Sequence, residues 1–263
     1  MNKRFRDAKR YEKTICAAIA IFLFLCLWQL VVSFTKAGIV MAGPVTVLGK
    51  FVSSIVEPIG TNTIQSHIFW SLTRVMIGFV MGSLAGIITG ILMGWSKPIE
   101  ALFRPLYELI RPIPPIAWIP LSIVWFGLGE PSKYFLIFLA AFSNITMNAY
   151  AGVRSVDTTL MGAARMLGAN ERQVFSTIVL PSCIPHIFAG LQIAVGSAWA
   201  TVVAAEMVRS SEGVGWVIIK GQDSNSTVQI MVGIMAVGIV GYILAVAMRA
   251  IEAKLCSWSV RGK

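Results

Sequence analysis

The sequence predicts an all-α protein, a polytopic membrane helix bundle with about six transmembrane helices. Three observations carry this prediction: 56% of the 263 residues are hydrophobic, only 13% are charged, and the mean hydropathy is +0.76. A soluble domain has roughly 25% charged and roughly 45–50% apolar residues. A soluble fold of this length could not cover so much apolar surface, and the same composition excludes a disordered chain.

Apolar runs long enough to cross a bilayer, which takes about 20 residues, alternate with charged residues along the chain. The first run, between Lys13 and Lys36, is longer than the roughly 7–15-residue core of a signal peptide, so we interpret it as a span. The third run is short and interrupted by prolines. We expect a single transmembrane domain over residues 1–263, with spans at about 14–35, 75–96, 113–129, 134–153, 183–207 and 228–248 and an inner loop at 154–181.

The basic residues orient these spans. The net charge is +10, and the positive charges flank apolar runs, which indicates membrane orientation and no nucleic-acid partner. If the N-terminus is cytoplasmic, the inner segments hold 16 of the 22 Lys and Arg residues. Both termini are therefore predicted to lie inside the cell.

Few residues in the sequence are suited to metal binding. The four cysteines form no C-x-x-C pair, and the two histidines, His67 and His186, lie far apart. We therefore expect no metal site and interpret the cysteines as small buried apolar residues.

Outside the spans, the segment Lys36–Arg74 has apolar residues from Val45 to Val56 at the spacing of an amphipathic helix. The second span carries glycines four residues apart. Such spacing lets helix backbones approach closely in lipid, so it indicates either tight packing or a surface along which helices slide. The glycines of this ridge are Gly78, Gly82, Gly86, Gly90 and Gly94.

The stretch from Arg111 to Pro120 contains four prolines and interrupts the third span. Carbonyl groups freed by proline must find partners or face a wet cavity, so this stretch is either part of a translocation path or a bend at the membrane surface. Glu206 is the one acidic residue inside a confident span, and it either faces the path or lies at the outer end of its helix, where Arg209 could pair with it. The candidate path and gate residues are Pro114, Pro115, Trp118, Trp125, Asn144, Asn148, Trp199 and Glu206.

The inner loop is predicted to form two short helices around Gly168, capped by Asp157 or Thr158 and by Asn170. Its residues Gly162–Gly168, followed after nine residues by Ile178–Pro181, resemble the EAA loop of the membrane subunits of ABC importers. Gly162 stands where that pattern has Glu. The resemblance implies a coupling loop that docks on an ATPase subunit, formed here by Gly162, Ala163, Ala164, Arg165, Gly168, Ala169, Glu171 and Pro181.

The resemblance extends over roughly residues 40–255 and is strongest to the nitrate, sulfonate and taurine branch of these permeases, notably the taurine permeases. It is carried by His67–Arg74, Arg111–Leu121, Trp125–Lys133, Gly190–Trp199 and Val203–Glu206. It implies a type I importer fold in the inner membrane of a bacterium. It also implies a second copy of the chain, two ABC ATPase subunits and an extracytoplasmic solute-binding protein as partners.

The implied cargo is a small anionic or zwitterionic solute, with taurine or another aliphatic sulfonate first, and nitrate, bicarbonate or a thiamine or flavin precursor as alternatives. We expect no catalysis and no cofactor in this chain, with ATP and Mg²⁺ bound by the partner. The stretch Gly43–Phe51 departs from an ATP-binding loop in its glycine spacing and in having Phe at the position that needs Ser or Thr. A secondary transporter and a membrane enzyme remain alternatives, although neither inverted repeats nor clustered catalytic side chains are evident.

Overall fold

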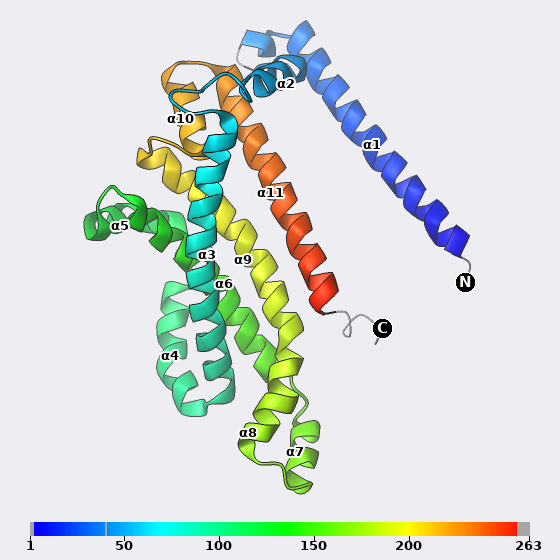
Figure 1. Ribbon diagram of the computed structural model, residues 1–263, viewed down its shortest axis with the longest axis vertical. Helices are drawn as coiled ribbons and strands as arrows, with labels where there is room; N and C mark the ends of the chain where they lie inside the picture. Colours follow the sequence, from blue (N-terminus) through cyan, green and yellow to red (C-terminus); the bar gives the residue numbers. More distant parts are fainter. Residues whose placement is uncertain (1–2, 40, 257–263) are drawn as a thin grey trace. The chain divides into compact units, whose positions relative to one another are not determined.

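The computed structural model describes residues 3–39 and 41–256, and this part of the chain is built from helices (Figure 1). The described residues contain only an isolated bridge between Ile59 and Asn62 in place of a β-strand. The prediction of an all-α membrane protein is therefore confirmed. The helices are α1 (Lys3–Phe34), α2 (Pro44–Ser53), α3 (Ile64–Trp95), α4 (Lys97–Ile110), α5 (Ile119–Phe126), α6 (Glu130–Arg154), α7 (Thr158–Met166), α8 (Glu171–Val174), α9 (Leu180–Arg209), α10 (Val214–Asp223) and α11 (Thr227–Leu255).

Shorter turns join some of these helices. A 3-10 turn, η1, covers Lys36–Ile39, and a second, η2, covers Pro115–Trp118 just before α5. A π-helical turn, η3, covers Phe175–Val179 and connects α8 to α9 without a break. The chain forms two compact units, residues 1–65 with 217–235 and residues 66–216 with 236–263.

In the first unit, α1 carries an apolar window, Ile15–Phe34, in which no residue is buried. The helix predicted near Val45–Val56 is α2, and Pro44 is its first residue. Proline suits that position because its ring fixes a helical φ and its missing N–H has no helical partner there anyway. Val47 of α2 is buried, whereas Val45 is 70% exposed.

In the second unit, α6 and α9 pack along each other around buried Ala141, Ile145 and Ala194 (Figure 1). Gly190 lies so close to α6 that an added Cβ would be 2.7 Å from the Cβ of Asn148. Small residues allow such close approach where lipid supplies no hydrophobic drive between helices. This helix pair forms the frame on which the candidate site is built.

In the described residues, five helices are long and apolar enough to cross a membrane, or six if the bent pair Lys97–Ile110 and Pro115–Phe126 is one crossing. The two arms of that pair meet at 85°. The sequence prediction placed the third span at 113–129 and did not include α4, because α4 carries charged residues and Pro105. The second and fifth predicted spans also begin earlier than expected. The second begins at Ile64, and the fifth begins at Glu171 because α8 and η3 continue into α9.

Candidate functional site

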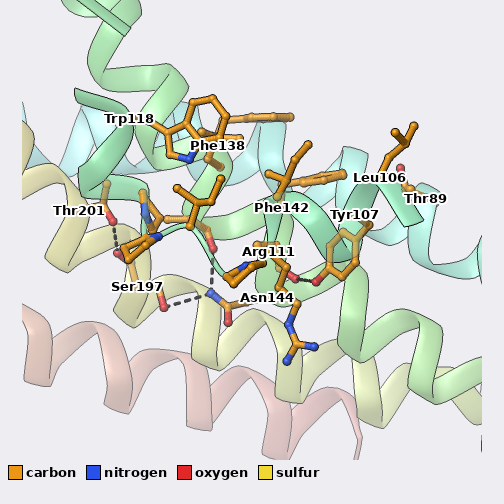
Figure 2. Close-up of a pocket in the computed structure, with 18 of the residues that line it drawn as sticks. Thr89, Leu106, Tyr107, Arg111, Trp118, Phe138, Phe142, Asn144, Ser197 and Thr201 are labelled. Carbon is orange, nitrogen blue, oxygen red and sulfur yellow. Dashed lines mark hydrogen bonds between the residues drawn. The ribbon is translucent and has the colours of Figure 1, made fainter. Parts of the chain in front are cut away.

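A cavity of about 670 Å³ lies in the second unit, between α3, α4, η2, α6 and α9 (Figure 2). The prolines at 112, 114 and 115 end α4 and turn the chain into η2, so this turn forms part of the wall. Trp118, Phe138 and Phe142 make much of the lining aromatic. The cavity is thus an apolar hollow of a size suited to a small molecule.

One flank of the cavity is polar. Asn144 of α6 donates from Nδ2 to Ser197 Oγ of α9 at 3.1 Å and to the Ala140 carbonyl at 2.8 Å. Thr201 donates to the Ser197 carbonyl at 2.7 Å, and Tyr107 of α4 donates to the Ser143 carbonyl at 2.6 Å. These bonds satisfy hydroxyl and amide groups that would otherwise be costly in an apolar surrounding.

Arg111, at the C-terminal cap of α4, is the one charged side chain among the described residues that line the cavity. In sequence, Arg111 is only the first residue of the proline-rich stretch, and its type alone assigns it no role in a cavity. Its place in the cavity depends on α4, a helix that the sequence prediction missed.

The structure separates the predicted path residues into two groups. Pro114, Pro115, Trp118 and Asn144 line the cavity. The other four do not line it. Trp125 is 55% exposed and packs against Trp118 and Phe135, and Asn148 contacts α9 near Gly190. Trp199 donates to the Val237 carbonyl at 3.0 Å, and Glu206 belongs to the cluster described next.

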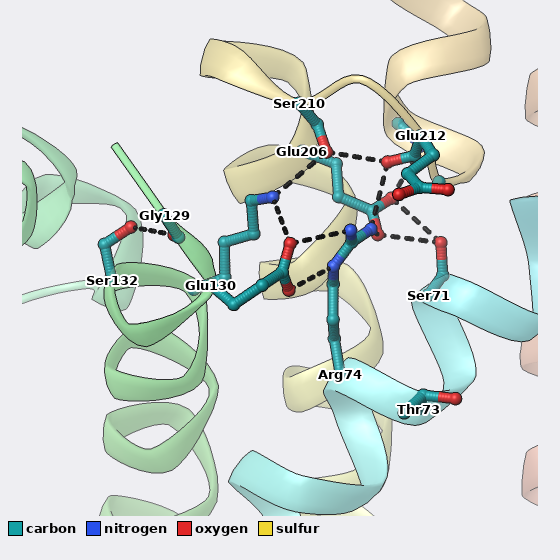
Figure 3. A network of polar contacts seen from close by, with 12 residues as sticks. Ser71, Thr73, Arg74, Gly129, Glu130, Ser132, Glu206, Ser210 and Glu212 are labelled. Atoms are coloured by element: carbon teal, nitrogen blue, oxygen red, sulfur yellow. Dashed lines mark hydrogen bonds and ion pairs between the residues drawn. The ribbon is translucent and has the colours of Figure 1, made fainter. Parts of the chain in front are cut away.

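A polar cluster joins α3, α6 and the end of α9 around the buried Arg74 (Figure 3). The Arg74 guanidinium donates to both Glu130 oxygens, from Nε at 2.6 Å and from Nη2 at 2.8 Å. Its Nη1 donates to Glu206 Oε1 at 2.8 Å and to the Glu212 carbonyl at 2.9 Å. Lys133 closes the cluster with bonds to Glu130 Oε1 at 2.9 Å and Ser210 Oγ at 3.1 Å.

Glu206 is therefore part of a neutral set of two cations and two carboxylates, and it is 1% exposed. Its carboxylate also accepts from Ser71 Oγ at 2.8 Å and from the backbone amide of Gly215 at 3.0 Å. The partner expected from sequence was Arg209, whose side chain lies outside the described part of the structure. A charged side chain inside a helix bundle requires such partners. The sequence therefore predicted that Glu206 needs a partner, but not which residue that partner is.

The loop after α9 packs against the face of α3 that also carries Ser71 and Arg74. His67 stacks on Trp216 with ring centres 5.1 Å apart, and its Nδ1 accepts from the amide of Gly213 at 3.1 Å. Gly213 has φ of +113°, and an added Cβ would lie 2.3 Å from the Glu206 carboxyl. Only glycine fits this position.

The predicted glycine ridge of α3 faces α6 along its length. An added Cβ at Gly78 would lie 2.6 Å from Ile137, one at Gly82 2.7 Å from the Phe138 carbonyl, and one at Gly94 2.5 Å from Val153. At Gly86 the nearest atoms, of Ile145 and Phe142, would be 3.1 Å away, and at Gly90 the Thr146 carbonyl would be 2.4 Å away. These distances favour tight packing over a sliding surface, because the Cβ space is already filled.

The inner loop forms the two short helices expected from its capping residues. Asp157 Oδ1 accepts from the amide of Thr159 at 2.7 Å at the start of α7, and this bond holds the pKa of the Asp157 carboxyl below its ordinary value. Asn170 and Gln173 form a reciprocal capping box at the start of α8, with bonds of 2.9 and 2.8 Å. Gly168 joins the helices with φ of +89°, a conformation that favours glycine.

The remaining loop residues divide between packing and exposure. Ala164 and Ala169 pack on the cluster of Val153, Val174 and Ile187 that roots the loop on α6 and α9. Arg165 Nε contacts Glu171 Oε1 at 2.7 Å on the exposed side. Added atoms at Gly162 would meet open space, Ala163 is half-buried, and Pro181 lies in the first turn of α9.

No group of three or more His, Cys, Asp or Glu side chains suited to a metal occurs within residues 3–39 and 41–256. The described cavity offers aromatic faces, hydroxyls, one amide and one guanidinium to a bound molecule. The base of the inner loop packs on α6 and α9, the same two helices that line the cavity.

Comparison with known proteins matches residues 82–255 to the family described as binding-protein-dependent transport system inner membrane component. The taurine transport system permease protein TauC of Escherichia coli (strain K12) is 39% identical over 196 residues, which are 74% of this chain and 71% of that protein. The nitrate import permease protein NrtB of Leptolyngbya laminosa is 35% identical over 242 residues, 90% of this chain and 85% of that protein. In fold, the chain is similar to the inward-facing MetNI methionine ABC transporter, with a TM-score of 0.60 and 19% identity over 69% of this chain and 90% of that chain.

Proposed function

Because this chain belongs to the family of binding-protein-dependent transport system inner membrane components, as an ABC importer permease of the taurine, nitrate and sulfonate branch, we propose that it forms the path by which a small anionic or zwitterionic solute enters a bacterial cell. Taurine or another aliphatic sulfonate is the first candidate solute, supported by the similarity to the taurine permease. Nitrate is the second, supported by the nitrate permease that matches most of both chains.

The proposed assembly has two copies of this chain, two ABC ATPase subunits and an extracytoplasmic solute-binding protein. The chain would act as one transmembrane domain over residues 1–263, and ATP and Mg²⁺ would bind to the partner ATPases. Closure of the ATPases would move the coupling loops and open the path outward, and hydrolysis would reset it. This division of labour fits a chain whose described residues form helices and a cavity suited to binding.

The observation that carries the proposal is the apolar tip of the inner loop. Met166 is 85% exposed and Leu167 is 90% exposed, at the turn where α7 ends and Gly168 reverses the chain. The loop behind them is rigid, because both short helices are capped and their bases pack on a buried cluster. A rigid, water-facing apolar tip is typical of a surface that inserts into a groove of another protein.

Replacing Leu167 with aspartate is expected to reduce ATP-driven uptake by about tenfold or more. Burial of a leucine side chain contributes about 1.5–3 kcal/mol, and the aspartate would carry a charge into the same groove. The folding of the permease should not change, because the side chain is 90% exposed. Uptake and ATPase activity are measured with the whole complex in vesicles.

The matched control is Ser176→Asp, which adds the same charge to the inner loop at an exposed position outside the predicted coupling residues. This variant should keep parental uptake, because Ser176 is not part of the apolar tip. If Leu167→Asp also kept parental uptake and ATPase coupling, the tip would not be the docking surface.

We also propose that both termini and the coupling loop are cytoplasmic, as the Lys and Arg distribution indicates. In a chain without its four native cysteines, Gly162→Cys should react with a membrane-impermeant maleimide only after the cells are opened. Val56→Cys, at a position that is 81% exposed, should react in intact cells. The reverse labelling pattern would invert the topology.

A further inference from the structure

We propose that Arg111 binds the anionic group of the solute inside the cavity, and that the rest of the solute lies against the aromatic wall. This inference rests on the proposed function, since it assigns a ligand class to the same site. It gives a specificity-determining role to Arg111, which the sequence marked only as the first residue of the proline-rich stretch.

The described lining of the cavity carries a single kind of charge, which is positive. Among the described residues lining the cavity, Arg111 is the only charged one, and no carboxylate lines it. The two acidic residues nearest to it along α4, Glu108 and Glu100, are both held by Arg104, at 2.8 and 3.2 Å. A guanidinium stays charged at all ordinary pH values, so the exposed Arg111 side chain at the edge of an apolar cavity can attract an anion.

Several polar side chains of the cavity wall already use their N–H or O–H groups in hydrogen bonds within the protein. Tyr107 and Thr201 already donate their hydroxyl protons to backbone carbonyls, and Asn144 donates to Ala140 and Ser197. These groups can orient a ligand but have few protons left to give. Arg111 carries five N–H donors in a planar fork that matches an oxyanion such as a sulfonate, a carboxylate or nitrate.

The part of the solute that lies beyond its anionic group would meet an aromatic surface. Phe138, Phe142 and Trp118 form an apolar wall, and the cavity of about 670 Å³ exceeds the size of a bare oxyanion. Because no carboxylate lines the described cavity, the ammonium of a zwitterion finds no counter-charge there. The site is therefore expected to bind solutes through their anionic group. An amine on the same solute could contact only the aromatic faces.

The experiment compares the parent with Arg111→Gln and with Arg104→Gln, which removes the same charge from the same helix outside the cavity. The thermal midpoint of the detergent-purified permease is measured with ethanesulfonate, with ethylammonium and with sodium chloride at matched ionic strength. We expect ethanesulfonate to raise the midpoint of the parent and of Arg104→Gln and not that of Arg111→Gln. Ethylammonium should have no effect beyond that of the salt.

Three results would overturn the inference: no effect of ethanesulfonate on the parent, an equal effect on Arg111→Gln, or a rise with phosphatidylglycerol that ethanesulfonate does not reproduce. The last result would assign Arg111 to a lipid headgroup. In the whole complex, Arg111→Gln should lower the uptake of ethanesulfonate or of taurine by about tenfold or more. If the parent complex showed no ATP-driven uptake at all, the proposed function would fail, whatever the thermal shifts show.

Discussion

Replacing Arg74 with leucine is expected to lower the free energy of unfolding by about 3–5 kcal/mol, because it leaves buried carboxylates without their partner. Arg74 is 2% exposed and contacts Glu130, Glu206 and the Glu212 carbonyl. Its removal would leave two negative charges that only Lys133 partly balances. The measurement is denaturant unfolding of the purified permease in mixed micelles.

Two further variants separate charge from shape. Arg74→Lys keeps the charge but lacks the planar fork that reaches both Glu130 oxygens, so it should recover only part of the stability. Arg104→Leu removes an arginine from an exposed ion pair and should cost less than about 1 kcal/mol. If Arg74→Leu were as stable as Arg104→Leu, the cluster would not hold α3, α6 and the end of α9 together.

Replacing Gly90 with leucine is expected to prevent α3 from seating on α6 and to abolish the recovery of folded permease. The Cβ alone would lie 2.4 Å from the Thr146 carbonyl and 2.7 Å from the Cβ of Ala149. Backbone atoms cannot move aside as a flexible side chain can, so the cost should exceed the usual ~1–3 kcal/mol of overpacking. Yield and monodispersity after detergent extraction measure the effect.

The matched control is Gly238→Leu, in the first half of α11, where an added Cβ meets nothing within 4 Å. It adds the same side chain to another glycine of an apolar helix and should leave the yield unchanged. Equal yields of the two variants would show that α3 does not need glycine to approach α6. Gly90→Ala should fall between the parent and Gly90→Leu.

Features set by local rules could be predicted from sequence. The caps at Asp157 and Asn170 depend on residues within three positions of each other, and the structure confirms them. The small-residue spacing of α3 also follows from one helix alone, since residues four apart share a face. Its partner, α6, could not be predicted, because spacing indicates that a helix packs closely but not against which neighbour.

Features set by distant residues were missed. Arg74 and Glu206 are 132 residues apart, and in sequence Arg74 lies at the edge of a predicted span, where a charge is unremarkable in composition. The helix α4 was missed because it mixes charged residues with an internal proline, and with it the cavity position of Arg111. Only the tertiary arrangement of α4 against α6 and α9 places Arg111 in the same cavity wall as Asn144 and Ser197.

The unbroken helical stretch from Glu171 to Val208 has 38 residues. At about 1.5 Å per residue it measures about 57 Å, whereas the hydrocarbon layer is about 30 Å thick. The stretch is therefore too long to lie wholly within the hydrocarbon layer. The same stretch carries Ser197 and Thr201, which line the cavity. The π-helical turn at Phe175–Val179 and Pro185 both lie between the loop and the cavity wall, so a tilt imposed at the loop would reach Ser197 through two points at which helices commonly bend.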